Sequence, residues 1–259
     1  MVDLDLESDG DARLVLAVGV AAGYDVEERF EASQSGLAVP VTVLDDSHGG
    51  RLHVLEVGSG PVHIEYTAAV DGFAATAAVD PIDEIRYLRP SRYCESDTLR
   101  PIAVAEFSGL RGAELLAAVS SWVGTRIAYV TGSSLPTDGA VRTLLSRRGV
   151  CRDFAHLVVA FLRALDVPAR VVGVYAPGLS PMDFHAVAEA AIDGVWHVVD
   201  ATTLAPRQSL VRIATGRDAA DIAFLSARGD RPVRIADLQV RAVVDELPRD
   251  DALALVELH

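Results

Sequence analysis

The Asp193-Gly194 dipeptide restricts the fold of this 259-residue chain more than any other local feature. It separates two runs in which apolar and polar residues alternate, 185–192 and 195–200, and this arrangement is the strongest short-range signal for a β-hairpin. A two-residue loop would pair Ile192 with Val195. Because side chains alternate along a strand, the imidazole of His185 and the carboxylate of Asp200 then share one face, with Cβ atoms roughly 5–8 Å apart.

A helix is predicted for the segment that begins near Cys151 and ends before Pro168. Its apolar residues recur at helical spacing and form one stripe: Cys151, Phe154, Ala155, Val158, Phe161, Leu162 and Leu165. Cys151 therefore falls in the first turn, with its side chain facing inward. The free N–H groups and the dipole of a helix start favour an anion, and thus the thiolate that a cysteine nucleophile requires. The alternative is a plain buried cysteine, which is common in protein cores.

A thiol, an imidazole and a carboxylate together can perform nucleophilic acyl transfer. The histidine takes the thiol proton and later protonates the leaving amine, while the aspartate fixes the tautomer of the ring and supports its positive charge. Taken alone, His185 and Asp200 fit an exposed hydrogen-bonded pair equally well. Combined with Cys151 at a helix start, they favour a catalytic triad.

These residues lie in motifs that resemble the bacterial transglutaminase-like superfamily. The motifs are GVCRDFAHL (149–157), VPARVVGVY (167–175), MDFHA (182–186) and VWHVVD (195–200). They are similar to the family's GVC[RQ]DFAHL helix and to its IPARYVSGY-type, D-x-HAW-type and W-x-x-x-D-type strands. The resemblance implies that Cys151 is the nucleophile, His185 the base and Asp200 the orienting acid. Two departures, Val187 in place of an aromatic residue and Gly139 where Thr-Ser-Ala is common, affect substrate preference more than catalysis.

Two further segments extend the resemblance. The residues that follow Tyr129 resemble the family's Y-x-x-G-x-S loop, and GRDAAD (216–221) resembles a segment near its end. Tyr129, Arg217 and Asp218 are therefore candidates for binding substrate or shaping the cleft, and the N–H of Cys151 is by position a candidate for binding an oxyanion. Three other residues receive no catalytic role: His156, which we interpret as structural, His197, on the face opposite to Asp200, and Cys94, which we expect to be inert.

The resemblance implies an α+β fold, in which a papain-like transglutaminase core with a cysteine triad follows a small antiparallel β domain. We expect the N-terminal β domain over residues 1–90 and the catalytic core, with a C-terminal β segment, over 91–259. Short Val-rich segments separated by turns predict strands at 12–20, 36–44, 51–57 and 61–70. Helices are predicted within 112–130 and over 140–149, the second closed by Gly149.

The expected reaction is attack of the Cys151 thiolate on an amide carbonyl of a peptide or protein, giving a thioester that water or an amine resolves. We favour water because nothing in the sequence marks a dedicated acceptor site. The alternative is a catalytically idle domain that binds peptides or a protein partner. No cofactor or metal is implied. His48, His53 and His63 would allow a three-histidine metal site, but they are better interpreted as loop or strand-face residues.

Composition excludes several other classes of protein. The chain has 23 basic and 37 acidic residues, a net charge of −14, which argues against nucleic acid or an anionic membrane surface as the main partner. Two cysteines, Cys94 and Cys151, are too few for a disulfide scaffold or a cysteine-rich zinc site. No apolar run reaches the ~18 residues of a membrane span, and the acidic N-terminus is unlike a signal peptide. We therefore expect a cytoplasmic protein.

Overall fold

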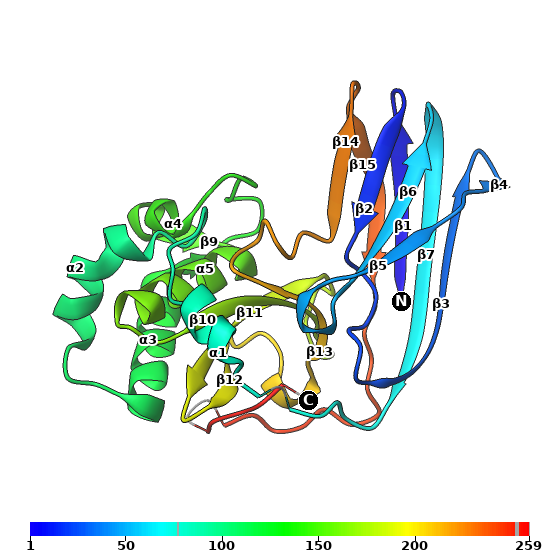
Figure 1. Cartoon of the computed structure of the whole chain (residues 1–259). Helices are drawn as coiled ribbons and strands as arrows, with labels where there is room; N and C mark the ends of the chain where they lie inside the picture. The colour runs from blue at the N-terminus through cyan, green and yellow to red at the C-terminus, as the bar shows by residue number, and fades with distance from the viewer. Residues whose placement is uncertain (77, 252–253, 259) are drawn as a thin grey trace.

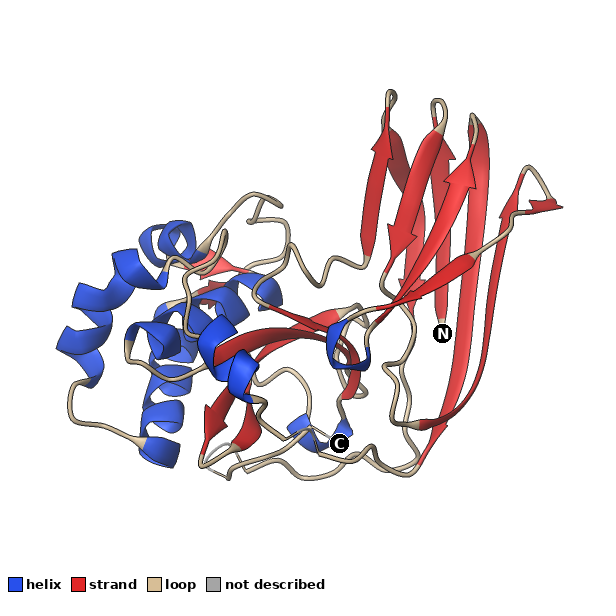
Figure 2. Ribbon diagram, in the orientation of Figure 1, coloured by secondary structure: helices blue, strands red, loops and turns tan. Residues whose placement is uncertain are grey.

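The computed structural model describes residues 1–76, 78–251 and 254–258. It comprises a two-sheet β-sandwich and a core in which helices pack on a separate four-stranded sheet (Figures 1 and 2). The sandwich contains β1 (Val2–Ser8), β2 (Ala12–Leu16), β3 (Asp25–Gln34), β4 (Leu37–Ala38), β5 (Thr42–Asp45), β6 (Arg51–Val57), β7 (Gly60–Asp71), β14 (Leu225–Gly229) and β15 (Val233–Val240), with a short 3₁₀ turn η1 (Ser47–Gly49). Within the described ranges, no helix combines the length and apolarity needed to cross a membrane.

The core contains five helices and the remaining described strands. The helices are α1 (Pro81–Arg86), α2 (Ser96–Phe107), α3 (Gly112–Arg126), α4 (Ala140–Ser146) and α5 (Cys151–Ala164), with a 3₁₀ turn η2 (Arg207–Ser209). The strands are β8 (Ala128–Tyr129), β9 (Arg148–Gly149), β10 (Ala169–Tyr175), β11 (His185–Ile192), β12 (Val195–Val199) and β13 (Val211–Gly216). Strands β12-β11-β10-β13 form an antiparallel sheet, as the α+β prediction requires.

The two sheets of the sandwich have the strand orders β15-β1-β7-β3-β4 and β14-β2-β6-β5. Alternate residues of facing strands, such as Leu4 in β1 and Leu14 in β2, are buried in a shared apolar cluster. The strand expected at 36–44 is divided into β4 and β5. Pro40 lies at the division, where it has no N–H to donate to a ladder.

The C-terminal β segment differs from the expected arrangement. The sequence-based prediction places it in the core, but β14 pairs with β2 and β15 pairs with β1, so these strands belong to the sheets of the N-terminal sandwich. Figure 1 shows them in orange beside the blue strands. The reason is that the edges of β1 and β2 accept any antiparallel strand with a matching apolar face, and distance along the chain does not restrict that pairing.

Helix α5 lies at the centre of the core, and residues 153–164 are all buried. It contacts α2, α3 and α4 as well as β10 and β11. Its contacts with the sheet use small residues, Ala186, Ala188 and Ala190, which allow the helix to approach closely. The predicted start of this helix at Cys151 is confirmed.

The predicted hairpin is also confirmed, since Ile192 pairs with Val195 and Ala188 with Val199. Asp193 and Gly194 have φ angles of 52° and 80°, and positive φ at both positions is what a type I′ turn requires. The end of α4 was predicted incorrectly. The left-handed residue that closes it is Arg147, with φ 55°, and not Gly149.

Candidate active site

Cys151 is the first residue of α5 and is half-buried. The helix start is held by Asp153, whose Oδ2 accepts the Val150 N–H at 2.8 Å, while Oδ1 accepts the Ser134 hydroxyl at 2.9 Å. A glycine is required just before this turn, because a Cβ on Gly149 would lie 2.6 Å from the Cβ of Asp153. The local sequence therefore fixes where the helix begins and hence where the thiol lies.

His185 and Asp200 form a buried hydrogen-bonded pair. The distance from His185 Nε2 to Asp200 Oδ2 is 3.0 Å, and the two side chains are 0% and 2% exposed. The other carboxylate oxygen accepts the N–H of Thr202 at 2.8 Å and its hydroxyl at 2.7 Å. The carboxylate therefore has hydrogen-bond partners on both oxygens, and its orientation toward His185 is fixed.

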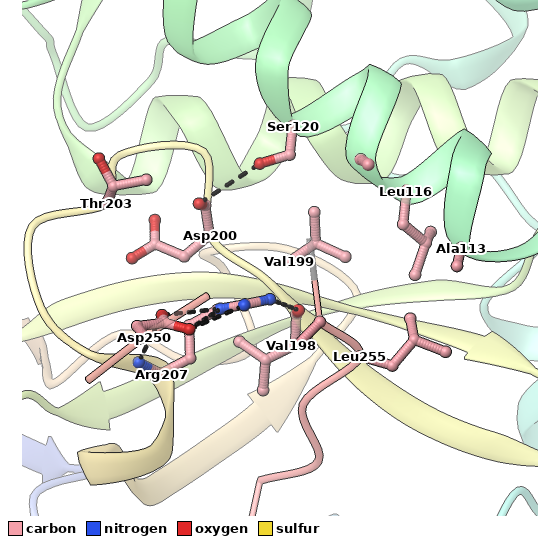
Figure 3. Close-up of a pocket in the computed structure, with 12 residues that line it drawn as sticks. Ala113, Leu116, Ser120, Val198, Val199, Asp200, Thr203, Arg207, Asp250 and Leu255 are labelled. Carbon is pink, nitrogen blue, oxygen red and sulfur yellow. Dashed lines mark hydrogen bonds and ion pairs between the residues drawn. The ribbon is translucent and has the colours of Figure 1, made fainter. Parts of the chain in front are cut away.

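The backbone around Asp200 is braced from two sides (Figure 3). Ser120 of α3 donates its hydroxyl to the Asp200 carbonyl at 3.4 Å. Arg207 donates to Asp250 at 2.8 Å and to the Val198 carbonyl at 3.4 Å, which ties the C-terminal segment to β12. The cavity between these groups measures about 30 Å³. That volume admits water but no peptide, so the cavity is not a second substrate site.

The charges of this pair follow from its contacts. Burial opposes ionisation of Asp200, but the hydrogen bonds from His185 and Thr202 outweigh burial and lower the pKa of its carboxyl. Burial likewise opposes the imidazolium, but Asp200 and the neighbouring Cys151 thiol raise the pKa of His185 to about 10. The surroundings therefore favour a carboxylate beside an imidazolium.

The thiol of Cys151 and the imidazole of His185 both line an open cleft of about 530 Å³. Nε2 of His185 is hydrogen-bonded to Asp200, which leaves the buried Nδ1 for the neighbouring Cys151 thiol. Nδ1 is therefore the nitrogen that is available to exchange a proton with the thiol.

The relation of α5 to the sheet differs from the sequence-based argument in one respect. We expected the helix start to face the surface shared by His185, Val187 and Asp200. The body of α5 instead packs on the opposite face, against the alanines of β11. His185 is the first residue of β11, so Cys151 approaches it past the end of the strand. Strand alternation alone does not reveal on which face a helix lies.

The three weaker candidates have different environments. Tyr129 packs against Phe154 with ring centroids 5.9 Å apart, and burial together with the nearby Cys151 raises its pKa to about 12. Arg217 pairs with Asp221 at 2.9 Å and does not line the cleft. Asp218 is buried, and its carboxylate accepts the N–H groups of Tyr93 and Ala220, each at 3.0 Å. Only Tyr129 is thus brought close to the thiol.

His156 holds the segment around Ala219, which forms one wall of the cleft. Its Nε2 accepts the N–H of Ala219 at 3.0 Å, and its ring stacks on Tyr93 at 5.5 Å. Burial lowers the pKa of His156 to about 3, so the ring is neutral and can accept this bond. The sequence predicts a structural role for His156. It gives no local signal for the partner of His156, Ala219, which lies in the segment that lines the cleft.

The three histidines of the sandwich side have separate partners. His48 contacts the Tyr87 hydroxyl at 2.8 Å, His53 stacks on Phe30 at 4.2 Å, and His63 contacts Asp5 at 2.9 Å. Within the described residues, the one group with potential metal-ligand geometry is His63 with Asp3 and Asp5. These residues lie on the surface of β1 and β7, away from Cys151.

Comparison with known proteins identifies the family. Residues 107–201, which include Cys151, His185 and Asp200, match the model of the transglutaminase-like superfamily. A solved structure of a proposed cysteine protease from Cytophaga hutchinsonii is 31% identical, with a TM-score of 0.88, and the alignment covers 99% of this chain and 94% of the other.

Two mycobacterial relatives match less of their own length. An uncharacterized protein of Mycobacterium leprae is 28% identical over 58% of this chain and 56% of its own. An uncharacterized protein of Mycobacterium tuberculosis is 37% identical over 31% of this chain and 26% of its own. The chain thus spans about half, or less, of these curated relatives. The full-length match to the Cytophaga structure and the family match over the helix and hairpin agree, and the chain belongs to the transglutaminase-like superfamily.

Proposed function

We propose that this protein is a cysteine-triad enzyme in which Cys151 attacks an amide carbonyl of a peptide or protein. The observation that carries the proposal is the buried 3.0 Å bond between His185 and Asp200 beside a half-buried thiol in an open cleft. A hydrogen-bonded pair with a structural role alone would need neither the thiol nor the cleft. The similarity to a proposed cysteine protease from Cytophaga supports the same reaction class.

In this mechanism His185 Nδ1 holds the proton released by Cys151, and the thiolate sulfur bonds to the carbonyl carbon. The carbonyl electron pair moves onto oxygen, where the N–H of Cys151 at the helix start is the candidate donor. When the carbonyl re-forms, the C–N bond breaks, and His185 passes its proton to the leaving amine. Asp200 supports the imidazolium throughout. A thioester on Cys151 and a free amine result.

Water then resolves the thioester. His185 removes a proton from water, the hydroxide attacks the carbonyl carbon, and the sulfur leaves as the thiolate. A primary amine would react by the same steps and give a new amide. We favour hydrolysis because Cys151 lines an open cleft that water can enter, and no residue described here forms a dedicated amine site. A cytoplasmic location stays a prediction.

The test uses a casein digest as the amide donor and monodansylcadaverine as the amine, with mass spectrometry of the products. We expect free carboxylic acids to dominate over dansylated adducts at millimolar amine, and all products to disappear with Cys151→Ala. Dominant adducts would replace the hydrolase proposal with a transferase. Full turnover by Cys151→Ala would exclude both, and absence of turnover with retained peptide binding would favour the catalytically idle alternative.

A further inference from the structure

We propose that the substrate site continues from Cys151 across the cleft onto the free edge of strand β14, where it binds an extended peptide that carries an apolar side chain near the scissile bond. This inference rests on the proposed function of Cys151. It gives the β-sandwich a direct part in substrate recognition.

The cleft is built by both parts of the molecule. Besides Cys151 and His185, it is lined from the core by residues such as Ala219 and Ile222. From the sandwich it is lined by Ala17, which follows β2, by Leu225 and Ser226 of β14, and by Ile235 of β15. Figure 1 shows β14 and β15 on the side of the sandwich nearest the helices. A peptide held by Cys151 and running along the cleft therefore meets these strands.

Strand β14 lies at the edge of its sheet, and no strand in the described part of the chain pairs with its outer side. It is the first strand in the order β14-β2-β6-β5, and its residues from Ser226 to Gly229 are exposed. The N–H of Ala17 donates to the Phe224 carbonyl at 3.0 Å, which makes Phe224 and Ala17 a hydrogen-bonded pair. In an antiparallel ladder such pairs alternate, so Ser226 also bonds to β2, while Leu225 and Ala227 direct their N–H and C=O groups outward.

An edge with outward N–H and C=O groups is a template for one more strand. Extended peptides bind such edges through main-chain hydrogen bonds, and the pockets beside the edge select side chains. Here Leu225 lines the cleft, and Ala227 lies one strand period beyond it, so we infer that their outward groups continue the site along β14. A peptide that pairs with β14 is thereby extended in the cleft, which is the conformation that presents its carbonyls.

The wall beside the reacting groups is apolar. Phe184 directly precedes His185, and its ring stacks on Phe224 with centroids 4.8 Å apart. Ile222 continues this wall and packs against the apolar clusters of both the core and the sandwich. Burying an apolar side chain here removes apolar surface of both partners from water, which favours binding.

The charged residues of the cleft select against acidic peptides. Arg152 also lines the cleft, but its guanidinium is engaged by Ser134 at 2.7 Å, by the Leu135 carbonyl at 3.0 Å and by Asp153 at 3.7 Å. Asp183 is exposed, and among the residues that the structure describes no cation pairs with it. The uncompensated charge in the cleft is therefore negative, and an acidic side chain beside it would be repelled.

The first experiment measures binding to Cys151→Ala, which removes the nucleophile. The probes are fluorescein-labelled octapeptide amides of threonine with a lysine at each end, which differ only in one central residue: phenylalanine, leucine, lysine or aspartate. We expect phenylalanine and leucine to bind at least about tenfold more tightly than aspartate. Equal binding of all four, or no binding at millimolar peptide, would overturn the apolar site.

A second series tests the strand pairing. In the phenylalanine peptide each backbone nitrogen is methylated in turn. Pairing with β14 predicts that methylation weakens binding at every second position, by about tenfold where one hydrogen bond is lost, and has little effect between. A peptide that fills the cleft without joining the sheet would show no period of two, and that result would overturn the edge site.

The protein side is tested with Ala227→Pro, which removes one outward N–H and no bond to β2. Proline is tolerated on an edge strand when its nitrogen faces solvent. We expect about tenfold weaker binding of the octapeptide, unchanged binding of a tripeptide amide too short to reach residue 227, and an unchanged rate of Cys151 alkylation in the otherwise native chain. The matched control Ala227→Ser keeps the N–H and should bind as the parent does.

These outcomes separate the two proposals. Equal octapeptide binding by Ala227→Pro and Ala227→Ser, with cleavage that still depends on Cys151, would exclude the edge site and leave the enzyme intact. A period-two methylation pattern without Cys151-dependent cleavage would exclude the enzyme and leave a peptide-binding site.

Discussion

His185 Nε2 lies 3.0 Å from Asp200 Oδ2, and neither side chain is more than 2% exposed. Because Asp200 accepts further bonds from Thr202, rotation away from His185 would break several contacts at once. The pair thus holds the imidazole with Nδ1 free for the thiol and supports its positive charge.

The carboxylate of Asp200 is expected to be essential for turnover. Asp200→Asn keeps the shape of the side chain but removes the charge that raises the pKa of His185. We expect kcat to fall by about 10³- to 10⁴-fold, as when a triad aspartate is replaced by asparagine. The matched control is Asp183→Asn, which removes an exposed carboxylate from the same cleft and should retain kcat. Steady-state rates of the two variants decide the question, and comparable losses would contradict the assigned role of Asp200.

The two cysteines are expected to differ sharply in reactivity. Cys94 is fully buried, and burial raises its pKa to about 12, whereas Cys151 is half-buried in the cleft. Iodoacetamide at pH 6 should therefore reach and modify Cys151 in the folded protein and leave the buried Cys94 unmodified. After denaturation it should modify both cysteines. His185→Gln should slow the reaction of Cys151 by at least about tenfold, since the group that accepts the thiol proton is lost. Peptide mapping by mass spectrometry measures both effects, and equal labelling of Cys94 and Cys151 in the native state would argue against a catalytic thiol.

The accuracy of the sequence-based predictions depended on how local the deciding interactions are. Asp193-Gly194 sets the hairpin register through backbone conformation within a few residues, so the approach of His185 to Asp200 was predictable. The start of α5 was predictable for the same reason. The return of β14 to β2 joins strands more than 200 residues apart, and alternation cannot name the partner of a strand.

The walls of the site were less accessible to sequence analysis. The bond from Ala219 to His156 spans 63 residues and depends on how a loop folds over α5. The face of the sheet on which α5 packs is likewise set by close contact between α5 and the alanines of β11. The alternating pattern of β11 does not predict which of the two faces of the strand the helix covers. At Cys151 the family motifs supplied what the local pattern did not. The resemblance implies that Cys151, His185 and Asp200 act together, although they are far apart in the chain.

A buried ion cluster around Glu189 lies on the face of the sheet opposite to α5. We expect it to control the stability of the protein in acid. Glu189 accepts from Arg170 at 2.7 Å and from Arg212 at 2.7 and 3.0 Å. Burial opposes its charge, but the two guanidinium groups outweigh burial and lower the pKa of Glu189 to about 2. Its contribution to the free energy of unfolding is therefore present above the ordinary pKa of about 4.5 and is lost as pH falls toward about 2.

Glu189→Gln should destabilise the protein by about 3–5 kcal/mol at pH 7. It removes the counter-charge of the buried Arg212 and leaves Arg170 with the more distant carboxylate of Asp83, at 4.0 Å. Urea unfolding from pH 7 down to pH 3 measures the effect. The difference between wild type and variant should shrink below pH 4.5, with a slope of at most about 1.4 kcal/mol per pH unit. A difference that stays constant through this range would mean that the charge of Glu189 is not what stabilises the fold.

His156 is expected to act on substrate binding by positioning the cleft wall. Its neutral ring accepts the N–H of Ala219, and Ala219 and Ala220 line the cleft, while Cys151, His185 and Asp200 are held by other contacts. His156→Phe removes the acceptor and leaves the partly buried N–H of Ala219 without it, so the wall should shift. We expect KM for a peptide substrate to rise by about tenfold, because the loss of one hydrogen bond has about that effect, and kcat to change by less than about threefold.

The control is His156→Gln, which offers a carbonyl oxygen to the same N–H and should restore KM in part. Because burial lowers the pKa of His156 to about 3, the ring does not titrate between pH 5 and 8, and the rise in KM should be the same across that range. A loss confined to kcat, or no difference between the glutamine and phenylalanine variants, would show that His156 does not act through Ala219.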